Sequence, residues 1–149
     1  MSENKKDETL FDKAVQNLNC AVVLYNSDTL DEVYLDYVGF HLQQTVELLI
    51  KFILEVKGIE YRNSYKMEQL ILLSQKNNVN LFFTDYIYDK VEMLSAWKMR
   101  TRKTISHKLE RNKVKEAITE VIKYLDIIDK YRKVISDDDK VVDIMPLKE

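Results

Sequence analysis

Apolar residues recur at steps of three and four along most of the chain, the spacing that places side chains on one face of an α-helix. The pattern is clearest in five stretches, at about residues 8–25, 29–57, 64–76, 84–99 and 112–135. Only two Gly and one Pro occur in 149 residues, so few positions would interrupt a helix. The sequence therefore predicts an all-α protein, an antiparallel bundle of four or five helices.

Single residues indicate where some of these helices begin, end and pair. Gly58 suits a left-handed residue that ends the second helix, and Asn112 is a candidate N-terminal cap for the last one. Glu47 and Lys51 lie four residues apart and can form an ion pair on the polar side of the second helix. That helix would be about 40 Å long, which predicts a central position in the bundle.

The length fits one domain over residues 1–149, with an ordered bundle at about 8–135 and an acidic tail at 136–149. The N-terminus has no apolar signal-peptide core, and no apolar run is long enough to cross a bilayer. We therefore expect a cytoplasmic protein with no membrane partner. Cys20 is the only cysteine, which excludes an intrachain disulfide, and its apolar neighbours predict a buried thiol.

Positive charge is concentrated in one stretch, residues 98–115, KMRTRKTISHKLERNKVK. This stretch holds eight Lys or Arg and one Glu, a local charge of +7 in a chain whose formal net charge is -2. Such segregation favours a phosphate-bearing partner, either RNA or a nucleotide. The alternative is a solvated basic loop, because short charged motifs often occur without a function.

Two side chains in this basic stretch are suited to metal-free cleavage of RNA. Arg102 can hold phosphate oxygens, and His107, five positions later, can move a proton near neutral pH. The other histidine, His41, lies between apolar residues of the second helix, and we expect it to be half-buried and hydrogen-bonded. No residue spacing predicts a metal site, and no motif predicts a cofactor.

Residues 37–53, YVGFHLQQTVELLIKFI, carry an aromatic residue and a His, then a Gln pair, then Glu and Lys one turn apart. This order resembles the second-helix signature of HEPN domains. The stretch LFDKAVQNLNCAVVLYN is similar to the first HEPN helix and NKVKEAITEVIKYLDII to the last, so the likeness extends from about residue 10 to residue 128. The spacing of Arg102 and His107 is similar to the R-x4-6-H motif of HEPN proteins that cleave RNA without a metal.

The resemblance implies a homodimer of helical bundles, in which the Arg and His of both subunits face one cleft. It implies a metal-independent endoribonuclease of the toxin type, with catalytic Arg102 and His107 and a nucleotidyltransferase-type antitoxin as partner. Basic residues around the motif would hold the RNA backbone. These phosphate-binding candidates are Arg100, Lys103, Lys108 and Arg111.

Two positions differ from the pattern of active HEPN proteins. Active members usually carry a small polar residue after the Arg and an aromatic residue two positions after the His, where this chain has Lys103 and Leu109. Residues 97–102 also resemble HEPN domains that lack the His. The alternative interpretation is therefore a non-catalytic HEPN module that binds a nucleotide or a partner protein and is associated with a nucleotidyltransferase.

Overall fold

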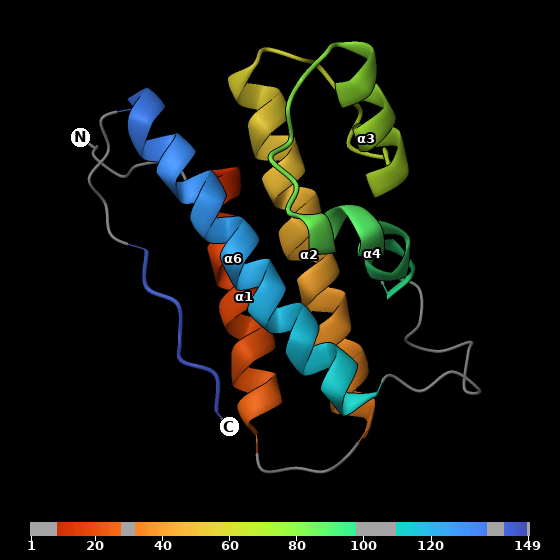
Figure 1. The fold of residues 1–149 in the computed structure, drawn as a ribbon, viewed down its shortest axis with the longest axis vertical. Coiled ribbons are helices and arrows are strands. Elements are labelled where there is room, and N and C mark those ends of the chain that lie inside the picture. The colour runs from red at the N-terminus through yellow and green to blue at the C-terminus, as the bar shows by residue number, and fades with distance from the viewer. Residues whose placement is uncertain (1–8, 28–31, 98–109, 137–141, 149) are drawn as a thin grey trace.

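The computed structural model describes residues 9–27, 32–97, 110–136 and 142–148, and these form five helices and no strand. With the labels of Figure 1, the helices are α1 (Leu10–Asn26), α2 (Glu32–Val56), α3 (Met67–Lys76), α4 (Asp85–Ala96) and α6 (Arg111–Ser136). The all-α prediction is confirmed. None of these helices is both long and apolar enough to span a membrane.

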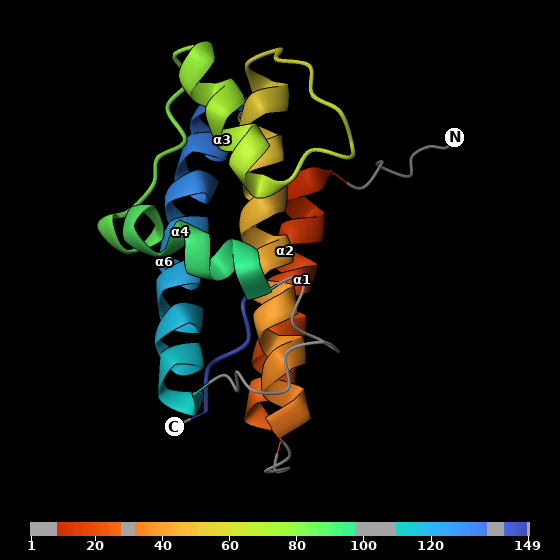
Figure 2. The same cartoon turned by 90° about the vertical axis from the view of Figure 1, so that its right-hand side faces the viewer.

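The three long helices α1, α2 and α6 pack side by side, and α1 runs opposite to the other two (Figure 1). The shorter helices α3 and α4 lie on the side of α2 that faces away from α1 (Figures 1 and 2). Both contact α2, and α4 also contacts α6. Because α2 has neighbours on two sides, it occupies the central position that its length predicts.

Local sequence sets the start of α1 and the end of α2. The Thr9 hydroxyl accepts from the Asp12 N–H at 3.0 Å, while the Thr9 N–H donates to the Asp12 carboxylate at 3.1 Å. At the end of α2, Gly58 has φ of +72°, and the Ile59 N–H donates to the Leu54 carbonyl at 2.9 Å. The predicted left-handed stop is therefore confirmed.

Two local predictions are wrong. Asn112 is not a cap, because α6 already begins at Arg111. The Val114 N–H donates to the Glu110 carbonyl at 3.0 Å, so Asn112 lies inside the first helical turn and not before it. Cys20 is exposed rather than buried, because the positions beside it, and not Cys20 itself, lie on the apolar stripe of α1.

One hydrophobic core joins all five helices. Its largest fully buried side chains include those of Trp97, Tyr124, Phe11, Leu18, Leu42, Leu49 and Ile87. Tyr124 brings a polar group into this core, and its hydroxyl donates to the Leu81 carbonyl at 2.7 Å. The Phe83 ring packs against the Tyr124 ring with 5.6 Å between centroids. This arrangement ties the connection between α3 and α4 to the middle of α6.

The C-terminal segment, residues 142–148, runs extended beside α1 (Figure 1). Val142, Ile144 and Leu147 of this segment pack against the core. Side-chain amides of α1 hydrogen-bond its backbone. This contact lies beyond residue 135, the position at which the sequence predicts the ordered bundle to end.

Replacement of Tyr124 by Phe tests how much the buried hydroxyl contributes. Tyr124→Phe keeps the ring but removes the donor to the buried Leu81 carbonyl, so we expect the free energy of unfolding to fall by about 1–3 kcal/mol. Denaturant-induced unfolding measures this change. Tyr88→Phe, at a side chain that is 72% exposed, is the matched control and should change stability by less than about 0.5 kcal/mol. Equal effects of the two variants would contradict the role given to the Tyr124 hydroxyl.

Candidate functional site

Most of the predicted site lies outside the described part of the chain. These predicted site residues are Arg100, Arg102, Lys103, His107 and Lys108. Their roles therefore stay predictions. The structure describes the residues on either side, Trp97 directly after α4 and Arg111 at the start of α6.

Arg111 is held against the last turn of α1. Its Nη2 donates to the Tyr25 carbonyl at 3.3 Å, and the guanidinium carbon lies 4.3 Å from the centroid of the Tyr25 ring. Carbonyl groups at the C-terminal end of a helix lack intrahelical donors and carry partial negative charge, so a guanidinium is a favourable partner there. The hydrogen bond uses one of five N–H donors of Arg111. The contact is therefore compatible with the predicted binding of phosphate.

Trp97 holds the chain at the other end of the basic stretch. Its side chain is 2% exposed and belongs to the core, and its backbone N–H donates to the Leu94 carbonyl. The R-x4-H sequence therefore connects two fixed points. One is the core contact of Trp97 and the other is the contact between Arg111 and α1.

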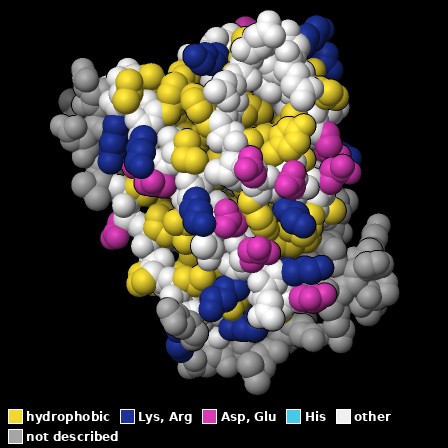
Figure 3. All heavy atoms as spheres, in the orientation of Figure 1, with side chains coloured by type: hydrophobic (Ala, Val, Ile, Leu, Met, Phe, Trp, Pro, Cys, Tyr) yellow, Lys and Arg dark blue, Asp and Glu magenta, His cyan; other side chains and the backbone are white. Residues whose placement is uncertain are grey.

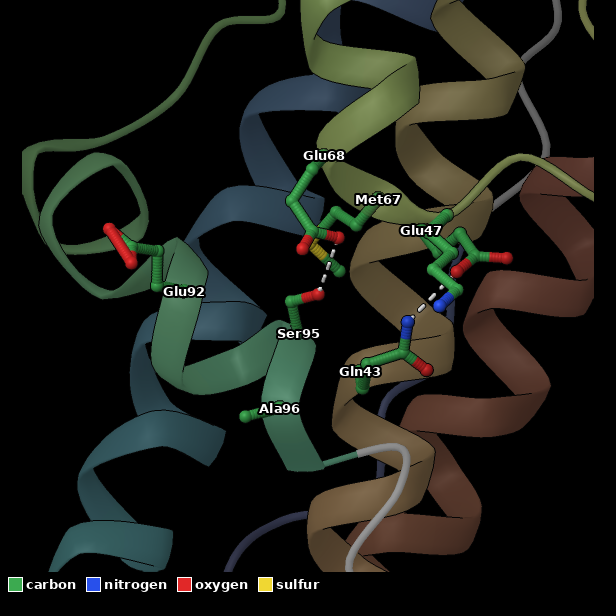
Figure 4. A pocket seen from close by; sticks show the side chains of 8 residues that line it. Gln43, Glu47, Met67, Glu68, Glu92, Ser95 and Ala96 are labelled. Carbon is green, nitrogen blue, oxygen red and sulfur yellow. Dashed lines mark hydrogen bonds between the residues drawn. The ribbon is translucent and has the colours of Figure 1, made fainter.

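A cavity of about 300 Å³ opens between α2, α3 and α4, next to the end of α4. Its lining consists of Gln43, Glu47, Lys66, Met67, Glu68, Glu92, Ser95 and Ala96. Figure 4 shows Glu68 of α3 facing Ser95 of α4, and the Ser95 hydroxyl donates to Glu68 Oε1 at 3.1 Å. Ala96 lies one residue before Trp97, so the cavity adjoins the start of the basic stretch.

A chain of hydrogen-bonded and ion-paired polar side chains runs along α2, and two of its members, Gln43 and Glu47, line this cavity. Gln44 Nε2 donates to Gln43 Oε1 at 2.8 Å, and Gln43 Nε2 donates to Glu47 Oε1 at 2.8 Å. Lys51 Nζ lies 3.2 Å from Glu47 Oε2, which confirms the predicted ion pair. Gln43 is only 1% exposed and Glu47 only 5% exposed. These two residues of the expected polar side of α2 are therefore covered by its neighbours.

The charges around the cavity argue against a phosphate ligand. Three carboxylates line it, from Glu47, Glu68 and Glu92, against the single ammonium group of Lys66. An acidic lining repels phosphate, so the cavity does not suit an RNA backbone. On the face seen in Figure 3, acidic and basic side chains are interspersed among apolar ones. The basic stretch at 98–115 therefore remains the best candidate for phosphate contacts.

His41 is half-buried and hydrogen-bonded, as predicted. Its Nδ1 lies 2.9 Å from Asn17 Oδ1, and Asn17 Nδ2 donates to the Lys13 carbonyl at 3.0 Å. Because Asn17 Nδ2 donates to Lys13, Asn17 Oδ1 is the atom left to accept, and we assign the donor role to His41 Nδ1. Burial lowers the pKa of His41 below its ordinary value of 6.5. These features assign His41 to the contact between α1 and α2.

Sequence reasoning did not identify the residues that α3 and α4 contribute to the cavity. Glu68 and Ser95 are 27 positions apart, and only the packing of α3 against α4 brings them together. No short-range spacing marks such a pair. Gln43 and Glu47 were visible in the sequence as polar residues one turn apart, but their burial depends on the helices packed around them.

Comparison with known families agrees with this architecture. The model of the HEPN domain matches residues 8–133, a range that includes α1 to α4 and almost all of α6. The chain belongs to the HEPN domain family. No curated protein and no solved structure matches the chain. The HEPN match covers the buried polar chain of α2, the cavity and the R-x4-H sequence, and it ends before the C-terminal segment.

The lowered pKa of His41 predicts a pH dependence of stability for this HEPN protein. The unfolded chain takes up a proton at about 6.5, whereas the folded chain does so only at lower pH. The stability contributed by neutral His41 is therefore present above pH 6.5 and is lost as the pH falls through the lowered pKa. Unfolding experiments at a series of pH values should show a smaller acid loss for His41→Gln than for the wild type. Both proteins keep His107, so its contribution cancels, and identical pH profiles would contradict the assignment.

Proposed function

We propose that this HEPN protein is a metal-independent endoribonuclease that acts through Arg102 and His107. The observation that carries the proposal is the R-x4-H spacing inside a stretch of local charge +7, in a chain of the HEPN family. The contacts of Trp97 and Arg111 support it, because they fix the chain on both sides of the motif.

The proposed reaction needs no metal, because RNA supplies its own nucleophile. The 2′-hydroxyl oxygen attacks the adjacent phosphorus, and the bond from phosphorus to the 5′ oxygen of the next nucleotide breaks. His107 accepts the proton of the 2′-hydroxyl or donates one to the departing 5′ oxygen, and each role contributes about 10²- to 10⁴-fold to the rate. Arg102 stabilises the charge that grows on the phosphate oxygens. The products are a 2′,3′-cyclic phosphate and a free 5′-hydroxyl.

A homodimer makes this chemistry complete. One histidine cannot easily be both the proton acceptor and the proton donor in a single turnover, whereas two subunits that share a cleft supply two. Arg100, Lys103, Lys108 and Arg111 would hold the RNA backbone through contacts that depend on salt and carry little sequence information. In this proposal the protein is the toxin of a pair, and a small nucleotidyltransferase is its antitoxin.

The second candidate is a non-catalytic HEPN module that binds a nucleotide or a partner protein. Lys103 and Leu109 favour it, because they stand where active members usually have a small polar and an aromatic residue. In this reading the basic stretch still binds phosphate, but His107 transfers no proton. The two candidates differ in one measurable result, the breakage of RNA.

The decisive experiment is incubation of the purified full-length chain with structured and unstructured RNA in excess EDTA. We expect cleavage by the wild type with 2′,3′-cyclic phosphate ends, and a loss of at least about 100-fold in His107→Ala and in Arg102→Ala. Arg62→Ala is the matched control, because Arg62 is exposed between α2 and α3, and this variant should keep full activity. Cleavage that survives in His107→Ala would refute the assignment of His107 as a catalytic residue. Salt-sensitive RNA binding without cleavage by the wild type would favour the binding module.

Sedimentation tests the assembly that the reaction requires. We expect a species of twice the 17.7 kDa chain mass at micromolar concentration. His107→Ala and Arg102→Ala should sediment as the wild type does, because the proposal gives these residues a chemical role and not an assembly role. A monomer at every concentration would remove the shared cleft and with it the two-histidine mechanism.

A further inference from the structure

Two asparagines of α1 hold the backbone of the C-terminal segment. Asn19 Nδ2 donates to the Asp143 carbonyl at 3.0 Å, and Asn19 Oδ1 accepts from the Met145 N–H at 2.8 Å. One step further along, Asn26 Nδ2 donates to the Pro146 carbonyl at 3.0 Å. Asn26 Oδ1 accepts from the Lys148 N–H at 2.7 Å. We call this pair of side chains the asparagine clamp.

The two asparagines bind the segment in the same way. Each amide accepts and donates once, and each brackets a single residue, Ile144 for Asn19 and Leu147 for Asn26. Seven helical residues span about 10.5 Å and about two turns, and three extended residues span about 10 Å. The clamp therefore matches an extended peptide that runs parallel to α1, with one asparagine for every three peptide residues.

The hydrogen bonds of the clamp do not depend on the type of side chain in the peptide. All four hydrogen bonds end on main-chain atoms, which every residue except proline offers at the N–H positions. The peptide's side chains contribute at three positions only, because Val142, Ile144 and Leu147 pack against the core. The side chains of Asp143, Met145, Pro146 and Lys148 are exposed. The surface thus fits any extended peptide with apolar residues at its first, third and sixth positions.

We infer that this face of α1 is a docking surface for an extended peptide of a partner protein, and that residues 142–148 are the intramolecular competitor that occupies it. The HEPN match supports the separation of the two parts, because it covers Asn19 and Asn26 and ends at residue 133, before the segment begins. The hydrogen bonds lie at an exposed surface, where water competes for both partners, so they permit exchange. The inference is independent of the proposed RNA cleavage.

The test uses a fluorescein-labelled synthetic peptide with the sequence of residues 142–148, VDIMPLK, and the full-length chain. In the variant Ile144→Asp/Leu147→Asp, the chain's own segment is weakened while the asparagine clamp stays intact. Because the competitor is weakened, we expect this variant to bind the peptide at least about tenfold more tightly than the wild type. Fluorescence anisotropy measures the affinity.

Two matched controls show whether the asparagine clamp binds the peptide through hydrogen bonds to its main chain. Addition of Asn19→Ala/Asn26→Ala to the weakened-segment variant should abolish binding, whereas addition of Asn63→Ala, at an exposed asparagine before α3, should not. A peptide methylated on the nitrogens that correspond to Met145 and Lys148 should bind at least about tenfold more weakly, because it lacks both donors. Circular dichroism confirms that each variant is folded.

Three outcomes would overturn the inference. They are equal affinity of the wild type and the weakened-segment variant, binding that survives loss of both asparagines, and no binding by the weakened-segment variant. If that variant does not fold, the ¹⁵N-labelled wild type is titrated with unlabelled peptide. The amide resonances of Met145 and Lys148 should then shift as the segment is displaced, and resonances that stay unchanged at saturating peptide would refute exchange.

Discussion

The centre of the bundle contains a buried carboxylate, that of Glu47, and its packing depends on partners for this charge. Glu47 is 5% exposed on a helix that has neighbours on two sides, and a buried carboxylate without partners would cost several kcal/mol. The helical repeat provides two partners, Gln43 one turn before and Lys51 one turn after. Because these two residues lie on α2 itself, their compensation of the charge does not depend on another helix. The polar side of α2 can then be covered by α3 and α4 without leaving an unpaired charge.

The helices were predictable because their signals are local. A three-and-four periodicity marks an amphipathic helix wherever it packs, and Gly58 ends α2 through its own backbone conformation. The same periodicity does not say how many neighbours a helix has. Glu47 was assigned to the polar side of α2 but is buried, and Cys20 was expected to be buried but is exposed. Burial depends on tertiary packing, and single-helix patterns report it only on average.

Some features of the candidate site are visible in the sequence, whereas others arise only from contacts between distant residues. The spacing of Arg102 and His107 and the charge of residues 98–115 are properties of the sequence. The partner of Arg111 is not, because Tyr25 lies 86 positions away and is brought close by the packing of α1 against α6. The asparagine clamp joins residues more than 100 positions apart, and its asparagines look like ordinary surface polar residues in the sequence. Side chains that bind main-chain atoms leave no complementary residue type for sequence analysis to find.

The last turn of α1 contacts both the end of the basic stretch and the C-terminal segment. The carbonyl and ring of Tyr25 hold Arg111 at the end of the basic stretch, and the adjacent Asn26 holds the backbone of residues 146–148. A partner peptide that replaced the C-terminal segment would therefore bind one residue away from the contact that anchors the basic stretch. Coupling between the two would need no long pathway, only a change in this single helical turn. A partner that docked on α1 would therefore act through the same helical turn that holds Arg111.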